Sequence, residues 1–532
     1  MENSALDDKS VHIHREDAVT TAGGVKVIPS DQREESQMQI TFNLWSTLGL
    51  VYSVTATPIA IGSYLTFSLV LGGSPFFIYG YILAVSLNII LCTALAEVSA
   101  IYPHPSGHVY WVGQMAPKKW SDFLSYWTGV LTMAAWFFWT AGTDLLTAQI
   151  LLAAVEVLYP GYSSTAWQVV LVAWAQVLVT FLWNVPFFKT WPYALKAMIL
   201  FTNAGVIFVA VSLLVRTHPK QSAQTVFVDI INESGWASTG VVFFLGLLPG
   251  TTAINGFDSA AHMVEEMPDP ARQVPQVMVG NALLSGISGL PMVIIFCFCA
   301  TNVQNLIDPV GGVTIIQIFT DSLQNEALFT IATFVYILST LVAATACTTT
   351  ASRVIWSFSE HNGIPFSAWF SHIHKTRFWA VPVNAIITVV VLSSAVILLN
   401  LGPSFVLGAF FSAANVCFYI SYAITLSCFV YKKRKYGLPS HYLDLGGFVG
   451  TILDAISIVW ALFASVWLLF PYYLPVTSEN MNYSVAIIAL VVVIFIFDWQ
   501  FRAKRQYTMP PPLRTHTTSS SYATQAVPDR YL

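Results

Sequence analysis

Two segments combine helix-breaking residues with small hydroxyl side chains inside otherwise apolar sequence. The first is Tyr52-Ser53-Val54-Thr55-Ala56-Thr57-Pro58, and the second runs from Gly246 to Gly256 and includes Pro249-Gly250-Thr251-Thr252 and Asn255. Proline removes a backbone donor and clashes with the preceding turn, and the residue before it avoids the α region. Both segments are therefore predicted to interrupt a helix. The first segment taken alone is equally well explained as a simple proline kink.

The chemistry expected at such interruptions comes from the backbone. Where a helix breaks, unpaired N–H groups at one end attract anions, and unpaired carbonyls at the other attract cations. A pair of broken helices can therefore hold a zwitterion without a full protein charge. Interrupted helices at corresponding places in two halves of a chain indicate a transporter site between the halves.

Charged residues within apolar sequence are a second group of candidates, because they are costly in a membrane. Glu97 and Asp258 lie near the inner ends of their segments, where an inner-gate or structural role is expected rather than direct contact with substrate. Either acid could pair with a loop base such as Arg353. Asp144 lies nearer the outside, where it either reaches water or takes a substrate or proton role.

Three other features have a purely structural explanation as well as a functional one. Lys196 is expected to anchor a helix at the inner boundary, and His262 to be an ordinary interfacial histidine rather than a proton relay. Trp136-Phe137-Phe138-Trp139 could hold a quaternary ammonium group by cation–π attraction. Consecutive residues point around a helix, so at most two can face one site, and packing is the alternative.

Composition shows which elements must position these residues. The chain of 532 residues is 55% apolar and 9% charged, whereas soluble domains carry about 25% charged residues. A membrane-spanning helix needs about 20 mostly apolar residues. Twelve such runs occur, near 43–71, 75–101, 122–155, 166–185, 191–215, 237–261, 277–300, 327–357, 380–400, 404–430, 447–470 and 484–501. An all-α polytopic membrane protein is predicted, and the two breaks fall in its first and sixth spans.

Charge and sequons predict how the spans are oriented. With the N-terminus in the cytosol, most loop Lys and Arg residues fall inside, including Lys432-Lys433-Arg434-Lys435. Two N-x-S/T sequons, at Asn232 and Asn482, fall on loops that this arrangement places outside. Both termini are therefore expected in the cytosol, and both asparagines are candidate glycosylation sites.

The remaining sequence narrows the class of protein. Residues 1–40 and 503–532 are polar and are expected to be cytosolic tails, the first of them disordered, around a transmembrane domain at 41–502. The six cysteines lie in apolar runs without a metal-ligand spacing. The net charge is −4, which does not point to nucleic acid. No metal cluster, nucleophile elbow or phosphate loop is evident, so no enzyme, metal or cofactor is predicted.

Four motifs resemble the amino acid–polyamine–organocation superfamily, and within it the fungal amino acid and choline (GABA/choline-like) permease branch. The stretch leaving span 6 is the most specific of them. The motifs are Leu95-Ala96-Glu97 with Pro105-Ser106-Gly107-His108, Gly256-Phe257-Asp258 through Glu265-Glu266, Ser352-Arg353 through Gly363-Ile364-Pro365, and Pro382-Val383-Asn384-Ala385.

This resemblance implies a leucine-transporter-type fold. Two inverted repeats, at about 43–215 and 237–430, would be followed by extra helices at 447–501. Substrate would bind at broken spans 1 and 6, flanked by spans 3 and 8. Carried over by position, the implied site comprises Ser53, Thr55, Ala56, Thr57, Pro249, Gly250, Thr251, Thr252 and Asn255.

Three departures from the family pattern bear on function. His108 stands where relatives usually have a second glycine, and Ser359–Gly363 lacks the usual arginine of the loop after span 8. Span 1 lacks the glycine-rich break of the amino acid carriers, which weakens a carboxylate-binding role there. Because the loop after span 8 lacks this arginine, its gating salt bridges do not follow from the resemblance.

The expected function is a proton-coupled permease that brings a small amino acid or a related amine into the cell by alternating access. Relatives in this branch take amino acids, γ-aminobutyrate, polyamines or choline. The alternatives are a choline-type or polyamine carrier, an exporter, or a nutrient sensor built on the same fold. The protein is expected to contact lipid in the plasma membrane, with the vacuolar membrane as the alternative.

Overall fold

A computed structural model describes residues 19–21, 24–26, 38, 40–67, 71–302, 305–306, 309–376, 380–402 and 406–512. The chain forms two units, one of Met1–Ser36 with Pro511–Leu532 and one of Gln37–Pro510. In the first unit, β1 (Val19–Thr21) and β2 (Gly24–Lys26) pair antiparallel, with Val19 opposite Lys26. The N-terminal segment 1–40, predicted to be disordered, therefore contains a short strand pair, and apart from residues 38 and 40 the rest of it lies outside the described residues.

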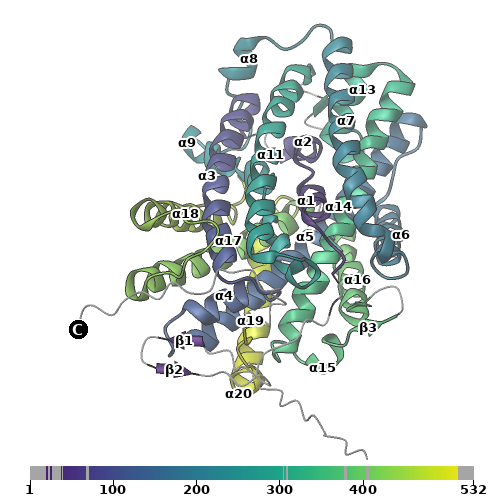
Figure 1. Cartoon of the computed structure of the whole chain (residues 1–532). Helices are drawn as coiled ribbons and strands as arrows, with labels where there is room; N and C mark the ends of the chain where they lie inside the picture. Colours follow the sequence, from purple (N-terminus) through teal and green to yellow (C-terminus); the bar gives the residue numbers. More distant parts are fainter. Residues whose placement is uncertain are drawn as a thin grey trace, which may run out of the picture. The chain divides into compact units, whose positions relative to one another are not determined.

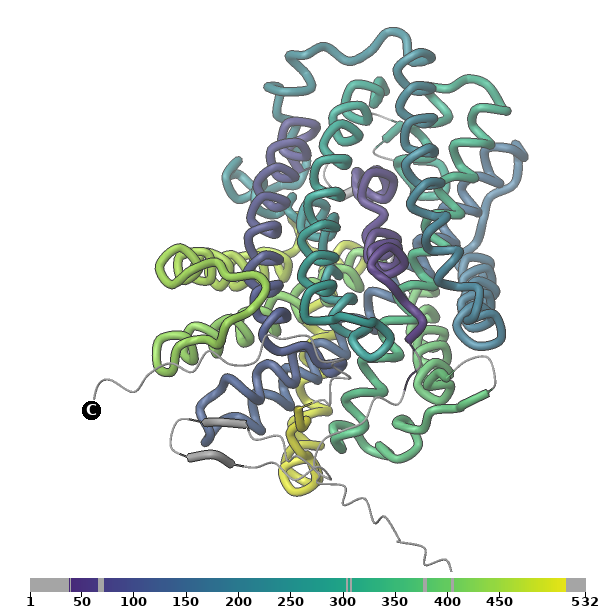
Figure 2. The backbone as a smooth tube through the Cα atoms, in the orientation of Figure 1, coloured from purple at the N-terminus to yellow at the C-terminus, as the bar shows by residue number. Residues whose placement is uncertain are grey.

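Within its described part, the second unit has twelve helices that are long and apolar enough to cross a membrane, as predicted. Figures 1 and 2 show them as a bundle. In chain order the spans are α1 (Leu44–Thr55) with α2 (Thr57–Ala60) and η2 (Ile61–Phe67), α3 (Gly73–Ile101), α5 (Ser121–Leu158), α6 (Ala166–Asn184), η3 (Phe188–Thr190) with α7 (Trp191–Arg216), α9 (Thr239–Leu245) with α10 (Leu248–Thr252) and η4 (Phe257–Glu266), α11 (Pro270–Cys299), α14 (Glu326–Glu360), α16 (Val383–Ile397) with η6 (Leu398–Leu401), α17 (Val406–Tyr436), α18 (Gly447–Trp467), and α19 (Ser484–Asp498) with η7 (Trp499–Ala503) and α20 (Lys504–Gln506).

Shorter elements connect the spans. They are α4 (His108–Met115), α8 (Ala223–Phe227), η5 (Val310–Gly312), α13 (Thr314–Leu323), α15 (Ser367–Phe370), and the antiparallel pair β3 (His374–Lys375) and β4 (Ala380–Val381). Side-chain caps fix where several helices begin, because they satisfy the first backbone N–H groups. The Asn43 side chain accepts from the Ser46 N–H at 3.0 Å before α1, and Asn325 accepts from the Leu328 N–H at 3.0 Å before α14.

The first span is enclosed by other helices. The helix α1 packs against α7, α11, α14 and η4, and Figure 1 shows it in the middle of the bundle. Outward faces carry exposed apolar side chains such as Leu200, Ile287 and Val459, at 76%, 71% and 67% exposure. A surface this apolar is unfavourable in water and suits contact with lipid chains. The protein is therefore an integral multi-pass membrane protein.

The helix α17 carries Lys432–Lys435 at its end, and we call the end of the bundle at which it finishes the basic end. It also carries α4, α15 and α20, toward the bottom of Figure 1. The segment predicted to be the C-terminal tail, 503–532, contacts the bundle near its start. Tyr507 is buried, and its hydroxyl lies 2.6 Å from the Ser125 hydroxyl of α5.

Candidate functional site

The first break lies where the sequence places it. The helix α1 ends at Thr55, and Ala56 adopts a left-handed conformation with φ of 40°. Such a φ is uncommon for a residue other than glycine, so the local backbone is strained. The helix resumes at Thr57 with Pro58 in its first turn, where proline's missing N–H is not needed.

The second break is longer. The helix α10 ends at Thr252, and non-helical turns lead to Gly256, which has φ of 85°. A Cβ at Gly256 would lie 2.9 Å from the Val54 side chain of α1 and 3.3 Å from the Trp136 ring of α5. Glycine is required here by its conformation and by the close approach of two other spans.

The two breaks are joined directly. The Thr57 hydroxyl donates a hydrogen bond to the Ala253 carbonyl, one of the carbonyls in the turn that interrupts span 6. On the other side of span 1, the Thr55 hydroxyl lies 3.2 Å from the Ser285 hydroxyl of α11. All nine residues predicted for the substrate site are buried: Ser53, Thr55, Ala56, Thr57, Pro249, Gly250, Thr251, Thr252 and Asn255.

Two asparagines outside the predicted set complete this region. Asn88 of α3 donates to the Thr251 carbonyl at 3.3 Å. Asn415 of α17 donates to the Thr252 hydroxyl at 3.0 Å and accepts from the Asn255 amide. Both asparagines lie in strongly apolar runs, and such isolation of an amide in a span is the signal that could have identified them.

Replacing Asn415 by alanine is expected to weaken the fold around the second break. The change removes a bond to Thr252 and leaves the Asn255 amide without its partner, and an unsatisfied buried polar group costs about 1–3 kcal/mol. We expect a lower Tm of the purified protein and reduced uptake. The control is Thr425→Ala on the same helix, whose hydroxyl donates to the Ser421 carbonyl of its own helix at 2.8 Å and to no other span among the described residues. Equal effects of the two changes would contradict the prediction.

Aromatic side chains line the neighbouring spans. Of the four consecutive aromatics in α5, Trp136 and Trp139 both pack against Phe418 of α17, with ring centroids 5.3 and 5.7 Å apart. Phe411, on the same side of α17, lies 5.8 Å from Trp139 and 5.5 Å from Tyr64 of η2. We call Trp136, Trp139, Phe411 and Phe418 the aromatic wall.

Asp258 lies in the first turn of η4 and is fully buried. Its Oδ1 accepts from the Tyr422 hydroxyl at 3.0 Å, and its Oδ2 accepts from the Trp136 indole N–H at 3.2 Å. Two imidazoles also face it, with His108 Nδ1 and His262 Nε2 lying 3.8 and 3.7 Å from Oδ2. Asp258 is therefore held by donors from two spans and does not pair with Arg353.

The two histidines beside Asp258 are buried. His262, expected to be an ordinary interfacial histidine, is 3% exposed and faces a buried carboxylate. His108 is brought beneath η4 because Gly107 turns the chain with φ of 48°, and a Cβ on Gly107 would lie 2.9 Å from the His262 ring. Burial lowers the pKa of His108 to about 4, so its imidazole is uncharged at neutral pH. The four-residue spacing of Asp258 and His262 places both on one face of a helix, and this spacing could have indicated their contact from the sequence.

Arg353 pairs with an acid that the sequence prediction did not select. Its Nε lies 3.1 Å from Glu266 Oε1 at the end of η4, and both side chains are buried. Its guanidinium lies 4.9 Å from the centre of the Phe188 ring. The Glu266 carbonyl also accepts from the Thr41 and Phe42 N–H groups at 3.1 and 2.9 Å. Spans 6 and 8 and the segment before α1 are thereby tied together at the basic end.

Glu97 belongs to a separate network. It lies 3.5 Å from Lys433 Nζ and 3.4 Å from His441 Nε2, and it accepts from the Leu445 N–H at 3.1 Å. Lys433 also lies 3.9 Å from Asp454. These contacts join α3 to the end of α17 and the start of α18, and an inner-gate or structural role for Glu97 stays a prediction.

Asp144 does not reach water, contrary to one of the two expectations. It is 1% exposed and accepts from the Gln176 amide of α6 at 3.3 Å. In the part of the chain that the structure describes, no Lys, Arg or His side chain pairs with it. Lys196 is exposed and lies 5.6 Å from the Tyr193 ring, as a boundary anchor would.

The two sequons differ in accessibility. Asn232 is exposed, whereas Asn482 is 3% exposed and donates to the Leu468 and Phe470 carbonyls at 2.9 and 3.1 Å. The folded chain therefore presents Asn232 and not Asn482 as an acceptor, and glycosylation at Asn232 stays a prediction.

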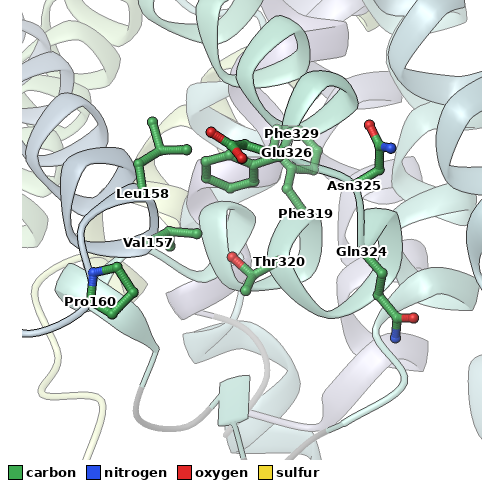
Figure 3. Close-up of a pocket in the computed structure, with 9 residues that line it drawn as sticks. All are labelled: Val157, Leu158, Pro160, Phe319, Thr320, Gln324, Asn325, Glu326 and Phe329. Atoms are coloured by element: carbon green, nitrogen blue, oxygen red, sulfur yellow. The ribbon is translucent and has the colours of Figure 1, made fainter.

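A surface cavity of about 270 Å³ lies away from this region, between α5, α13 and α14 (Figure 3). None of the predicted site residues lines it. Its lining residues are Val157, Leu158, Pro160, Phe319, Thr320, Gln324, Asn325, Glu326 and Phe329.

Comparison with known proteins agrees with this architecture. Residues 42–494 match the amino acid permease family model, and the chain belongs to this family. A choline transporter of Saccharomyces cerevisiae is 26% identical over 89% of this chain and 83% of its own length. A putative amino acid/polyamine transporter of Macrophomina phaseolina is 27% identical over 82% of this chain and 97% of its own. An amino-acid permease of Arabidopsis thaliana is 24% identical over 92% of this chain and 97% of its own.

The similarity extends over nearly all of the membrane domain and confirms the resemblance found in the motifs. The relatives are transporters and permeases rather than enzymes. This protein is accordingly a membrane transporter of amino acids or organocations.

Proposed function

We propose that the chain is a proton-coupled permease that imports a small amino acid or related amine by alternating access around the breaks in spans 1 and 6. The observation that carries the proposal is the bond from the Thr57 hydroxyl to the Ala253 carbonyl. It places the two interruptions against each other, so that polar backbone from both can act on one solute.

Substrate recognition is proposed to use backbone and neutral side chains. Hydroxyls of Thr55, Thr57 and Thr252 and the Asn255 amide lie around the breaks and are buried. A charged solute entering this region gains hydrogen bonds that are strong in a low-dielectric site. The solute's own ammonium and carboxylate then supply the full charges that the protein lacks there.

Coupling to protons is proposed to involve Asp144. Its carboxylate is buried, has one neutral hydrogen-bond partner and has no cationic partner among the described residues. An isolated carboxylate is costly in this environment, so protonation and ionisation would favour different conformations. Asp258 is less suited to this role because hydrogen-bond donors already stabilise its charge, and Arg353 is less suited because it is paired with Glu266.

A choline-type substrate is the second candidate, favoured by the aromatic wall. Indole and phenyl faces attract quaternary ammonium groups, by about 2 kcal/mol or more when water is excluded. Trp136 and Trp139 approach the breaks from span 3, and Trp136 borders Gly256 directly. A relative described as a choline transporter agrees with this candidate.

Uptake in permease-deficient yeast tests both candidates. Labelled choline, γ-aminobutyrate, putrescine and several amino acids are offered with and without a protonophore. We expect protonophore-sensitive accumulation of one of these compounds, and its loss in Asp144→Asn. Trp139→Leu is expected to raise KM about tenfold or more for choline only, whereas the control Phe137→Leu, at a half-buried position, leaves KM unchanged.

The alternatives make different predictions. Accumulation that is the same with and without the protonophore would contradict proton coupling. Efflux of a preloaded compound without net uptake would indicate an exporter. No flux of any compound at normal surface expression would favour the nutrient sensor. The proposed location in the plasma membrane, with cytosolic termini and the vacuolar membrane as alternative, is checked by tagging each terminus.

A further inference from the structure

The buried carboxylate of Asp258 is fixed from two sides. Tyr422 of α17 donates to one oxygen at 3.0 Å, and Trp136 of α5 donates to the other at 3.2 Å. Hydrogen bonds to a carboxylate favour its ionised form and set its orientation. The same oxygen that accepts from Trp136 is the one that both histidines face.

Neither histidine contact is a hydrogen bond, because 3.7 and 3.8 Å exceed the range for one. The His262 Nδ1 lies 3.1 Å from the Pro105 carbonyl oxygen, which can only accept. This nitrogen therefore carries its hydrogen, and in a neutral ring Nε2 directs a lone pair toward Asp258. Neither ring nitrogen of His108 has a hydrogen-bond partner among the described residues.

The His262 lone pair that faces the carboxylate repels it unless a cation lies between them, and His108 Nδ1 faces the same oxygen at 3.8 Å. A proton can bridge one nitrogen and one oxygen, so it joins only one of the two imidazoles to Asp258. A metal ion can accept all three groups at once. The three ligand atoms lie within 4.8 Å of one another, and a tetrahedral ion with bonds of about 2.1 Å places its ligands roughly 3.4 Å apart. Small side-chain rotations suffice to close this difference.

We propose that His108, Asp258 and His262 form a binding site for a divalent transition-metal ion, with Zn²⁺ the best match to two imidazoles and one carboxylate. The surrounding contacts are those that metal ligands need. His262 donates its other N–H to a backbone carbonyl, and the Asp258 oxygens are held by Trp136 and Tyr422.

The bound ion joins α4 to η4 at the basic end. The ligands come from the loop after span 2 and from the last part of span 6, which are far apart in sequence. Binding therefore stabilises the folded arrangement and raises Tm. Among the described residues, Cys92 of α3 is a further titratable side chain near Asp258, besides the two histidines and Tyr422. The site does not depend on the identity of the transported solute.

The test is a chelator-competition titration of the full chain, purified in detergent, with Zn²⁺. We expect one ion per chain and a rise in Tm, with Mg²⁺ giving neither. Co²⁺ is expected to give the visible absorption of a tetrahedral site. H108G and H262N should each weaken binding at least tenfold, and Trp136→Phe should weaken it by about 10–100-fold through the Asp258 orientation.

A matched control is available at the same end of the bundle. Glu97, His441 and Asp444 form a second group with metal-ligand atoms, but it has one imidazole, and Asp444 is exposed. H441N should leave Zn²⁺ binding unchanged. H108Q, with a side chain that fills similar space, checks that H108G has not disturbed folding.

Two results would overturn the proposal. Zn²⁺ binding that persists in both H108G and H262N would place the ion elsewhere. No Zn²⁺ binding by the wild-type protein, together with a shift in the pH profile of uptake in H108G, would assign a proton to the cluster and not a metal.

Discussion

Gly250→Leu is expected to abolish transport, and Gly250→Ala to reduce it strongly. A Cβ at this position would lie 2.8 Å from the Ala84 Cβ, 3.0 Å from the Gly80 carbonyl oxygen and 3.1 Å from the Tyr81 Cα of α3. None of these atoms belongs to a flexible side chain, so α10 must move away from α3. Such overpacking costs about 1–3 kcal/mol and displaces the backbone that leads into the second break. The measurement is uptake normalised to surface expression.

The facing glycine of α3 provides a matched control. A Cβ at Gly80 would meet its nearest neighbours, the Gly246 carbonyl oxygen and the Leu247 side chain, at 3.8 Å, which is ordinary van der Waals contact. Gly80→Ala lies at the same helix pair as Gly250 and should therefore leave uptake near the wild-type level. Normal uptake by Gly250→Leu would contradict both the packing argument and the proposed substrate site.

Arg353→Met is expected to destabilise the protein by about 3–5 kcal/mol, because it leaves the Glu266 carboxylate buried without its cation. The change also removes the contact with the Phe188 ring. The end of η4 would then lose its tie to α14, while the Thr41 and Phe42 N–H bonds to the Glu266 carbonyl remain. Thermal unfolding of the purified protein measures the loss, and uptake should fall with it.

The double variant Arg353→Met with Glu266→Met separates the charge effect from packing. Removing both partners leaves no uncompensated charge, so the double variant should be more stable than either single change. If Arg353→Met unfolds at the wild-type temperature, or if the two changes simply add, the pair does not stabilise this end of the bundle.

The sequence predicts the spans and the breaks well because both depend on local physics. Twelve apolar runs of sufficient length correspond to twelve helices, since a chain in lipid must satisfy its backbone within each helix. Pro58 marks the first interruption for a local reason, a missing donor and a steric clash, and Gly256 marks the second by its left-handed backbone. Pro249 lies in the first turn of α10, where it separates α10 from α9 and not from η4. The short helices α4 and α13 were not predicted, because they are too short to give a membrane signal.

Partners of charged and polar residues could not be predicted in this way. Arg353 had Glu97 and Asp258 as expected partners and pairs with Glu266. Asp144 was expected either to reach water or to act in transport. It is buried and accepts from Gln176 of α6, so the first expectation is wrong and the second stays a proposal. Which of several acids meets a base depends on how helices far apart in sequence rotate and cross, and hydrophobic patterning alone leaves that rotation open.

The sequence by itself determined that this protein is a twelve-span permease with interruptions in its first and sixth spans. Only the tertiary structure decided that Thr57 meets Ala253, that Asn415 bonds Thr252, and that His108 and His262 converge on Asp258. The physical reason is that a span's existence depends on the free energy of moving one segment into lipid. A site depends on side-chain packing between segments, which no single segment encodes.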